Sequence, residues 1–247
     1  MMKNDITRFI ASKQLSESTK KAYYYDLQQF VEVVSGKITP EKLSLYEHSL
    51  ADLKVSAKKR KLSAVNQFLY FLYEQGKLER FYKLNNQEKM VTQPADCSLL
   101  DYGCFYQETS QKAGQLIALL IVELGLLPQE IQHLTPADVD SQFAVLRLKR
   151  SGMVRILQVP ERLLPYLVAQ LSEGQYLFDH KGKPYSRQWF FTQLKAFLST
   201  YGFETLSAQD LRQQYILHQK EAGKSILEIS KQLGLKSPIT LEKYYTS

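Results

Sequence analysis

The chain ends in LSAQDLRQQYILHQKEAGKSILEISKQLGLKSPITLEKYYTS, residues 206–247, and this stretch decides how the rest of it is interpreted. A first predicted helix carries Gln209 and, one turn later, Arg212. A second helix opens at Ser225, because the Ser-x-x-Glu phrase that ends at Glu228 fits a capping box. The stretch closes with a tyrosine pair almost at the end of the chain. Taken singly these residues are weak evidence of a functional site, because a lone arginine on a helix is most often a surface residue and a terminal tyrosine pair most often serves packing.

The positive charge of the chain is concentrated in its first part. The chain has 247 residues and a formal net charge of +7. Residues 1–90 hold 16 lysine and arginine residues against 10 acidic ones, whereas the remainder holds 16 against 15. A basic first region favours a polyanionic partner such as nucleic acid, although solubility alone is the simpler explanation of such a balance.

Targeting and metal-binding signals are missing from the sequence. The N-terminus, MMKNDITRFIASK, lacks the apolar core of a signal peptide. The longest apolar stretch, around Leu116–Leu127, is interrupted by Glu123 and Gly125 and is too short to cross a membrane. The two cysteines, Cys97 and Cys104, fit no zinc-binding spacing. We expect a soluble, cytoplasmic protein that needs neither a metal nor another cofactor.

The first domain is predicted to contain four helices, of which the first is a short amphipathic turn. Ser16 or Ser18 caps the second helix, and Thr39 caps the third, with Pro40 at the first helical position. Ser56 opens the fourth helix. The apolar residues of the second and fourth helices recur at helical spacing and are the expected core: Tyr23, Leu27, Phe30, Val31 and Val34, and then Leu62, Val65, Leu69 and Leu72.

Four consecutive cations begin the fourth predicted helix. Lys58, Lys59, Arg60 and Lys61 lie in its first turns, where the helix dipole disfavours positive charge. A bound anion such as a DNA phosphate would offset this cost, so these four residues are the candidate DNA contacts. The alternative is an ordinary solvated basic turn.

The second domain follows a polar stretch, NNQEKMVTQPADC, that indicates a linker at residues 85–97. The apolar segment AGQLIALLIVELGL predicts a buried helix. AVLRLKR and MVRILQVP alternate as two strands with a turn at Ser151-Gly152, and amphipathic helices follow. The predicted domains are residues 1–84 and 98–247, and the predicted class is mainly α with a small antiparallel sheet, an α+β fold.

The C-terminal stretch resembles the signature of the tyrosine recombinases, the family of the phage integrases and the XerC/XerD group. In that family a helix carries His-x-Leu-Arg, a Leu-Gly-His follows, and the nucleophilic tyrosine comes nine residues after that histidine. Arg212 matches the arginine and Tyr244 the tyrosine. The phrases LSESTKKAYYYDLQQF and SAKKRKLSAVNQFLYFLYEQGK resemble the SAM-like core-binding domain that precedes the catalytic domain. The resemblance is strongest to the XerD group and implies two domains that close around duplex DNA as a clamp.

The resemblance also implies a reaction, phosphoryl transfer without metal or ATP. In the family a tyrosine attacks a DNA phosphodiester, forms a 3′-phosphotyrosyl link and frees a 5′-hydroxyl. Two arginines hold the phosphate oxygens, a lysine in the sheet hairpin protonates the leaving oxygen, and two histidines assist. The matching residues are Lys149, Arg212 and Tyr244, with Arg150 and Tyr245 as alternatives in neighbouring register.

Three positions of the family pattern are changed in this chain. The family phrase G-L-R-x-S-E reads GLLPQE at residues 125–130, so Leu127 stands where the first arginine belongs. Gln209 and Leu235 stand where the two histidines belong. Because the loss of one preorganised transition-state donor typically lowers a rate by about 10²–10³, we expect little or no strand cleavage.

Three functions are therefore compared. The favoured one is a XerD-like DNA-binding protein whose cleavage chemistry is degraded or lost. The second is a working site-specific recombinase that uses Lys149, Arg212 and Tyr244. The third is a protein-interaction partner of a genuine Xer-type recombinase that does not bind DNA. Only three residues follow Tyr244, which span at most ~10 Å, so we expect no tail exchange between protomers and a monomer off DNA.

Overall fold

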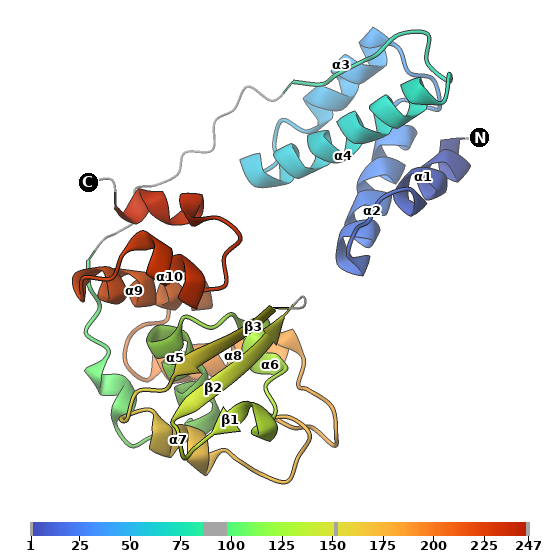
Figure 1. Cartoon of the computed structure of the whole chain (residues 1–247). Coiled ribbons are helices and arrows are strands. Elements are labelled where there is room, and N and C mark those ends of the chain that lie inside the picture. Colours follow the sequence, from blue (N-terminus) through green and yellow to red (C-terminus); the bar gives the residue numbers. More distant parts are fainter. Residues whose placement is uncertain (1, 86–97, 151–152, 246–247) are drawn as a thin grey trace. The chain divides into compact units, whose positions relative to one another are not determined.

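The computed structural model describes residues 2–85, 98–150 and 153–245. The chain divides into two compact units, Met1–Gln93 and Pro94–Ser247 (Figure 1). Of the predicted linker, only Asn85 belongs to the described residues, and the predicted domain boundaries stay a prediction. Among the described helices, none combines the length and the apolar character that crossing a bilayer requires.

The first unit contains the four predicted helices, α1 (Met2–Ala11), α2 (Glu17–Val33), α3 (Pro40–Ser49) and α4 (Val55–Glu74). Ser16 accepts a hydrogen bond from the backbone of Thr19 and caps α2, and Thr39 caps α3 in the same way. The start predicted at Ser56 is one residue late, since α4 begins at Val55 without a side-chain cap.

One apolar core joins the helices of the first unit. The predicted stripe of α4 is buried, and α1 contributes Phe9, whose ring contacts Phe68 and Phe71. The stripe of α2 is buried at its centre, while Tyr23 and Val31 are only partly covered. Helical spacing of apolar residues therefore predicted this half of the molecule well.

The second unit is built around α5 (Lys112–Leu124), which is buried on nearly all sides and packs against α8 and α9. A three-stranded antiparallel sheet has the order β1-β2-β3, as predicted except for the two-residue strand β1. The other elements are η1 (Gly103–Tyr106), α6 (Pro128–Gln132), η2 (Pro136–Asp138), β1 (Val139–Asp140), β2 (Val145–Arg150), β3 (Met153–Gln158), α7 (Leu164–Ala169), α8 (Arg187–Ser199), α9 (Ala208–Glu221), α10 (Ile226–Gln232) and η3 (Pro238–Tyr244).

The register of the β2–β3 hairpin gives it an inner and an outer face. Leu148 pairs with Arg155, and Lys149 pairs with Val154; the predicted turn at residues 151–152 lies outside the described residues. Directly paired residues of antiparallel strands share a face, and neighbours along a strand alternate. Leu148 is buried, so Arg155 also faces the core, whereas Lys149 and Val154 face solvent.

Side chains of α9 hold the first described residues of the second unit. The amide of Gln214 accepts from the backbone N–H of Leu100 at 2.9 Å and donates to the carbonyl of Ser98 at 3.0 Å. The ring of His218 is hydrogen-bonded to the carbonyl of Leu100 at 3.0 Å. His218 is therefore a structural residue in this unit.

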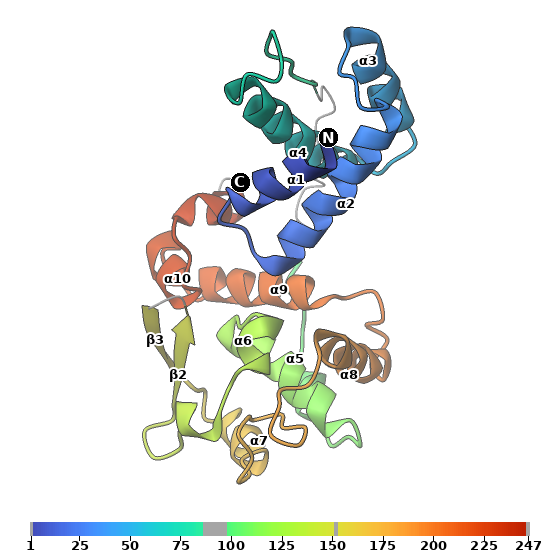
Figure 2. The same cartoon turned by 90° about the vertical axis from the view of Figure 1, so that its right-hand side faces the viewer.

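A small separate core closes the C-terminal end. It consists of residues from α9, α10 and η3: Tyr215, Ile216, Leu217, Ile229, Leu233, Leu241 and Tyr244. The predicted capping box is present at the start of α10, where Ser225 and Glu228 bond each other's backbone N–H groups. In both views, α10 lies beside β3, at one end of the sheet (Figures 1 and 2).

Candidate functional site

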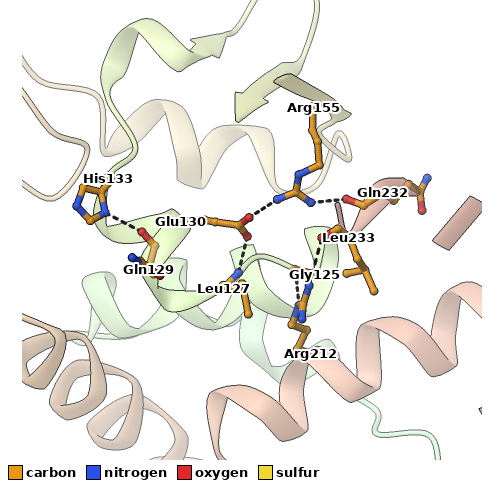
Figure 3. Close-up of polar contacts among 9 residues, drawn as sticks. All are labelled: Gly125, Leu127, Gln129, Glu130, His133, Arg155, Arg212, Gln232 and Leu233. Atoms are coloured by element: carbon orange, nitrogen blue, oxygen red, sulfur yellow. Dashed lines mark hydrogen bonds and ion pairs between the residues drawn. The ribbon is translucent and has the colours of Figure 1, made fainter. Parts of the chain in front are cut away.

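Arg212 is held by backbone carbonyls. Its Nε atom donates to the carbonyl of Gly125 at 2.8 Å and its Nη2 atom donates to that of Leu233 at 3.4 Å (Figure 3). Gly125 ends α5 with a left-handed φ of 64°, a conformation that glycine adopts without strain. A Cβ atom at Gly125 would lie 2.6 Å from side-chain atoms of Leu233 and Tyr215. The glycine thus lets the end of α5 approach closely enough for Arg212 to reach its carbonyl.

A second arginine, Arg155 of β3, reaches the same place from the sheet. It forms an ion pair with Glu130 and donates to the carbonyl of Gln232 (Figure 3). The other carboxylate oxygen of Glu130 accepts the backbone N–H of Leu127 at 2.8 Å. The side chains of Arg155 and Glu130 are only 11% and 6% exposed. Arg155 therefore connects β3, α6 and α10.

The two arginines meet at the C-terminal end of α10. Arg155 binds the carbonyl of Gln232 and Arg212 binds that of Leu233, the next residue (Figure 3). The last carbonyls of a helix carry partial negative charge, which explains why two guanidinium groups gather there. Two guanidinium groups, one of them paired with the Glu130 carboxylate, therefore lie at the end of one helix.

The hydroxyl of Tyr215 lies close to this pair of arginines. It donates to the side-chain oxygen of Gln232 at 2.9 Å. Burial raises the pKa of Tyr215 to about 12, and the positive charges of Arg155 and Arg212 oppose that rise. Tyr215 is thus neutral at physiological pH and serves as a hydrogen-bond donor.

Tyr244 is buried in the C-terminal core. It is 4% exposed, its hydroxyl donates to the side chain of Gln213 at 3.4 Å, and its carbonyl accepts from Lys220. The neighbouring Tyr245 donates to the carbonyl of Lys224 at 2.7 Å. Burial raises the pKa of Tyr245, and the negative charge of Glu228 adds to the rise. The structure brings Tyr244 to α9, at the residue next to Arg212, but keeps it covered.

Lys149 lies on the outer face of the hairpin. It is exposed on β2, on the face opposite to Arg155. It lines a surface depression of about 520 Å³ to which Glu130 and His133 also contribute. Lys149 and Arg155 therefore approach the Glu130 region from different sides. The competing candidate Arg150 is the last residue of β2.

The three positions that differ from the family pattern lie just before α6, on α9 and just after α10. Leu127 is partly buried at the start of α6, two residues beyond the carbonyl that binds Arg212. Gln209 is exposed on the first turn of α9. Leu235 is partly buried and packs against the C-terminal core. None of these side chains has the arginine or imidazole group that the family pattern requires.

Arg155 was missed in the sequence analysis. Its signal was available, because an arginine occupies an inward-facing position of a strand whose other inward residues are apolar. A charge at such a position indicates a buried partner, since burying an unpaired charge is strongly unfavourable.

Part of the basic run on α4 has an internal partner. Asp26 of α2 is 3% exposed; it pairs with Arg60 and, at 3.2 Å, with Lys61. This pairing offsets some of the unfavourable dipole interaction without any external anion. Lys58 and Lys59 are partly buried on the same turns. The role of these four residues in binding DNA stays a prediction.

Comparison with known proteins identifies the family. Residues 6–76 match the family described as phage integrase, N-terminal SAM-like domain. The sequence is 52% identical over 245 residues to the "Tyrosine recombinase XerD-like" of Streptococcus agalactiae serotype III, covering 99% of this chain and 100% of the relative. The chain belongs to the XerD-like tyrosine recombinases. The Streptococcus mutans protein of the same description is 50% identical over 240 residues, 97% of this chain and 98% of the relative.

Solved structures confirm the fold of this XerD-like chain. The XerH site-specific recombinase, bound to its difH substrate in a pre-cleavage complex, gives a TM-score of 0.72 at 17% identity, covering 92% of this chain and 76% of that one. A lambda integrase dimer bound to a COC′ core site gives 0.68 at 17% identity and covers 95% of each chain. The predicted recombinase resemblance and the α+β class are confirmed.

Proposed function

We propose that this XerD-like chain binds duplex DNA and cuts it very slowly or not at all. The observation that carries the proposal is Leu127. Its side chain has no hydrogen-bond donor, and its backbone N–H is already bound by the Glu130 carboxylate. In the family an arginine at this position would bind a phosphate whose negative charge grows toward the transition state.

The burial of Tyr244 supports the same conclusion. A nucleophile must reach within about 3–3.5 Å of the phosphorus before it attacks. The Tyr244 side chain is 4% exposed and bonded to Gln213, so the C-terminal core must open first. This opening step would slow strand cleavage further, beyond the effect of the changed donors. Such losses do not add simply when residues act as a unit.

DNA binding is supported by charge and by the relatives. Residues 1–90 carry +6 of the formal net charge of +7, and α4 carries four consecutive cations in its first turns. The XerH and lambda integrase structures hold DNA substrates. We propose that residues 1–84 and 98–247 both contact the duplex, as the two halves of a clamp, and that the chain is a monomer off DNA. Light scattering at micromolar concentration, with and without DNA, tests the monomer.

A nicked suicide substrate tests the loss of cleavage. The duplex carries a Xer-type core site, and a covalent protein–DNA adduct is read on a denaturing gel. We expect binding in a mobility-shift assay on the same duplex and no adduct within an hour. A genuine Xer recombinase is the positive control, and Tyr244→Phe is the negative one.

The alternatives give different results in the same assay. An adduct that forms within minutes and depends on Tyr244 would show a working recombinase and refute the proposal. Absence of any DNA binding at low salt would favour a protein-interaction partner of a Xer recombinase.

A further inference from the structure

We propose that Arg155 is a second DNA-phosphate-binding residue, which together with Arg212 supplies the guanidinium that Leu127 lacks. The inference rests on the proposed function, since it requires that the chain binds DNA. It assigns a role to a residue that the family pattern did not single out. The proton-transfer positions Gln209 and Leu235 stay changed, so the site binds phosphate without restored cleavage.

The first argument is convergence. Arg155 comes from β3 and Arg212 from α9, yet their guanidinium groups bind the carbonyls of two consecutive residues, Gln232 and Leu233 (Figure 3). Both positive charges act on the hydroxyl of Tyr215. Two arginines that converge on one point form the arrangement that binds the non-bridging oxygens of a phosphate.

The second argument is the carboxylate that connects Arg155 to the changed position. One carboxylate, that of Glu130, binds the Arg155 guanidinium with one oxygen and the Leu127 backbone N–H with the other. A single carboxylate thus spans the space between the guanidinium and the residue where the family arginine would begin. The Glu130 carboxylate shows that this space accepts a negatively charged oxygen, which a phosphate would supply in its place.

The third argument is the room that the chain leaves for this side chain. Gly234 follows α10 with a φ of 62°, and a Cβ atom there would lie 2.8 Å from both Cδ and Nε of Arg155. Glycine at this position therefore permits the arginine stem to pass under the end of α10.

Glu130 and DNA phosphate then compete for Arg155. In the free chain the carboxylate and the α10 carbonyl hold the guanidinium, and on DNA a phosphate oxygen takes the place of the carboxylate. The competing explanation is a purely structural ion pair that ties β3 to α6. The two explanations predict different changes in duplex affinity. Removing the Glu130 carboxylate strengthens DNA binding only if Arg155 binds a phosphate.

The experiment measures duplex affinity by fluorescence anisotropy from low to moderate salt for full-length variants. R155Q is expected to weaken binding and to reduce the log–log salt slope by about 0.9, the value for one phosphate contact. E130Q is expected to tighten binding by about tenfold, the order of one charge-assisted hydrogen bond. R162Q and E123Q are matched controls, because Arg162 pairs with the buried carboxylate of Glu123 elsewhere in the second unit.

The expected result is that R155Q weakens duplex binding, E130Q strengthens it, and both controls leave it unchanged. Equal weakening by both variants, or no change in either, would overturn the role of Arg155 while leaving DNA binding intact. If R155Q is unfolded at the assay temperature, the sign for E130Q decides, since a structural pair predicts no gain in affinity. If the wild type binds no duplex at low salt, the proposed function fails and this inference fails with it.

Discussion

The Nε atom of Arg212 lies 2.8 Å from the carbonyl oxygen of Gly125, the left-handed residue that ends α5. The orientation of the best-matched arginine of the site is thus set by a backbone conformation 87 residues earlier in the chain. That conformation needs a residue without a Cβ atom, because side chains of Leu233 and Tyr215 occupy the space.

Replacing Gly125 by alanine should therefore destabilise the second unit. The left-handed conformation costs a non-glycine residue about 1–2 kcal/mol, and overpacking adds about 1–3 kcal/mol. Gly223→Ala is the matched control, since Gly223 has a φ of 82° but nothing lies within 4 Å of its Cβ position. Urea unfolding measures both variants. Equal losses of stability in the two would show that the space beside Gly125 can adapt.

The four consecutive cations of α4 should form two pairs that differ in their effect on stability. Lys58→Ala with Lys59→Ala should weaken duplex binding and flatten its salt dependence while lowering stability by less than about 1 kcal/mol. Arg60→Ala with Lys61→Ala should also destabilise the first unit by about 3–5 kcal/mol, because Asp26 is left buried without its partners. Anisotropy titrations and thermal melts check both pairs. An unchanged affinity and slope for the first pair would remove this helix from the DNA face.

Restoring the changed positions should restore cleavage. The triple variant Leu127→Arg, Gln209→His and Leu235→His supplies the three missing side chains of the family pattern. We expect a covalent adduct on the nicked substrate, because each donor contributes about 10²–10³ in rate. The same triple variant with Tyr244→Phe is the control. A triple variant that binds DNA but forms no adduct would place the defect in the burial of Tyr244.

Stability should fall at alkaline pH, and Tyr215 should contribute to the fall. Its pKa is raised by burial to about 12 in the folded chain, against about 10 when unfolded. The unfolded state therefore loses its proton first, so the contribution of Tyr215 is complete below pH ~10 and is lost as the pH rises toward 12. Tyr215→Phe should be less stable at neutral pH by about 1 kcal/mol, the worth of its hydrogen bond.

The check is a series of urea titrations between pH 8 and pH 11. The difference in stability between wild type and Tyr215→Phe should shrink as the pH rises. Tyr166→Phe is a control for the loss of a tyrosine hydrogen bond, since Tyr166 donates to the carbonyl of Tyr106. A constant difference across this range would contradict the assigned shift.

Local signals in the sequence predicted most of the fold. Ser16, Thr39 and Ser225 each cap a helix through a residue three positions away, so their effect could be read without tertiary contacts. Apolar spacing likewise predicted the buried α5. The strand β1 has only two residues, too few for an alternating pattern, and the sheet has one strand more than the sequence indicated.

The site was less predictable, because its contacts join distant parts of the chain. The bond from Arg155 to Glu130 spans 25 residues, and that from Arg60 to Asp26 spans 34. Comparison with the family phrase identified Leu127 as a changed residue. The sequence alone did not indicate which groups surround that side chain. Burial of Tyr244 also depends on packing among α9, α10 and η3, which no short phrase encodes.

The attachment of residues 98–100 to α9 has a mechanical consequence. Gln214 and His218 hold this segment, and both lie within two helical turns of Arg212. A pull on residues 98–100 would be transmitted to α9 through the hydrogen bonds of Gln214 and His218. Because α9 also carries Arg212, such a pull would act on the helix that positions this arginine.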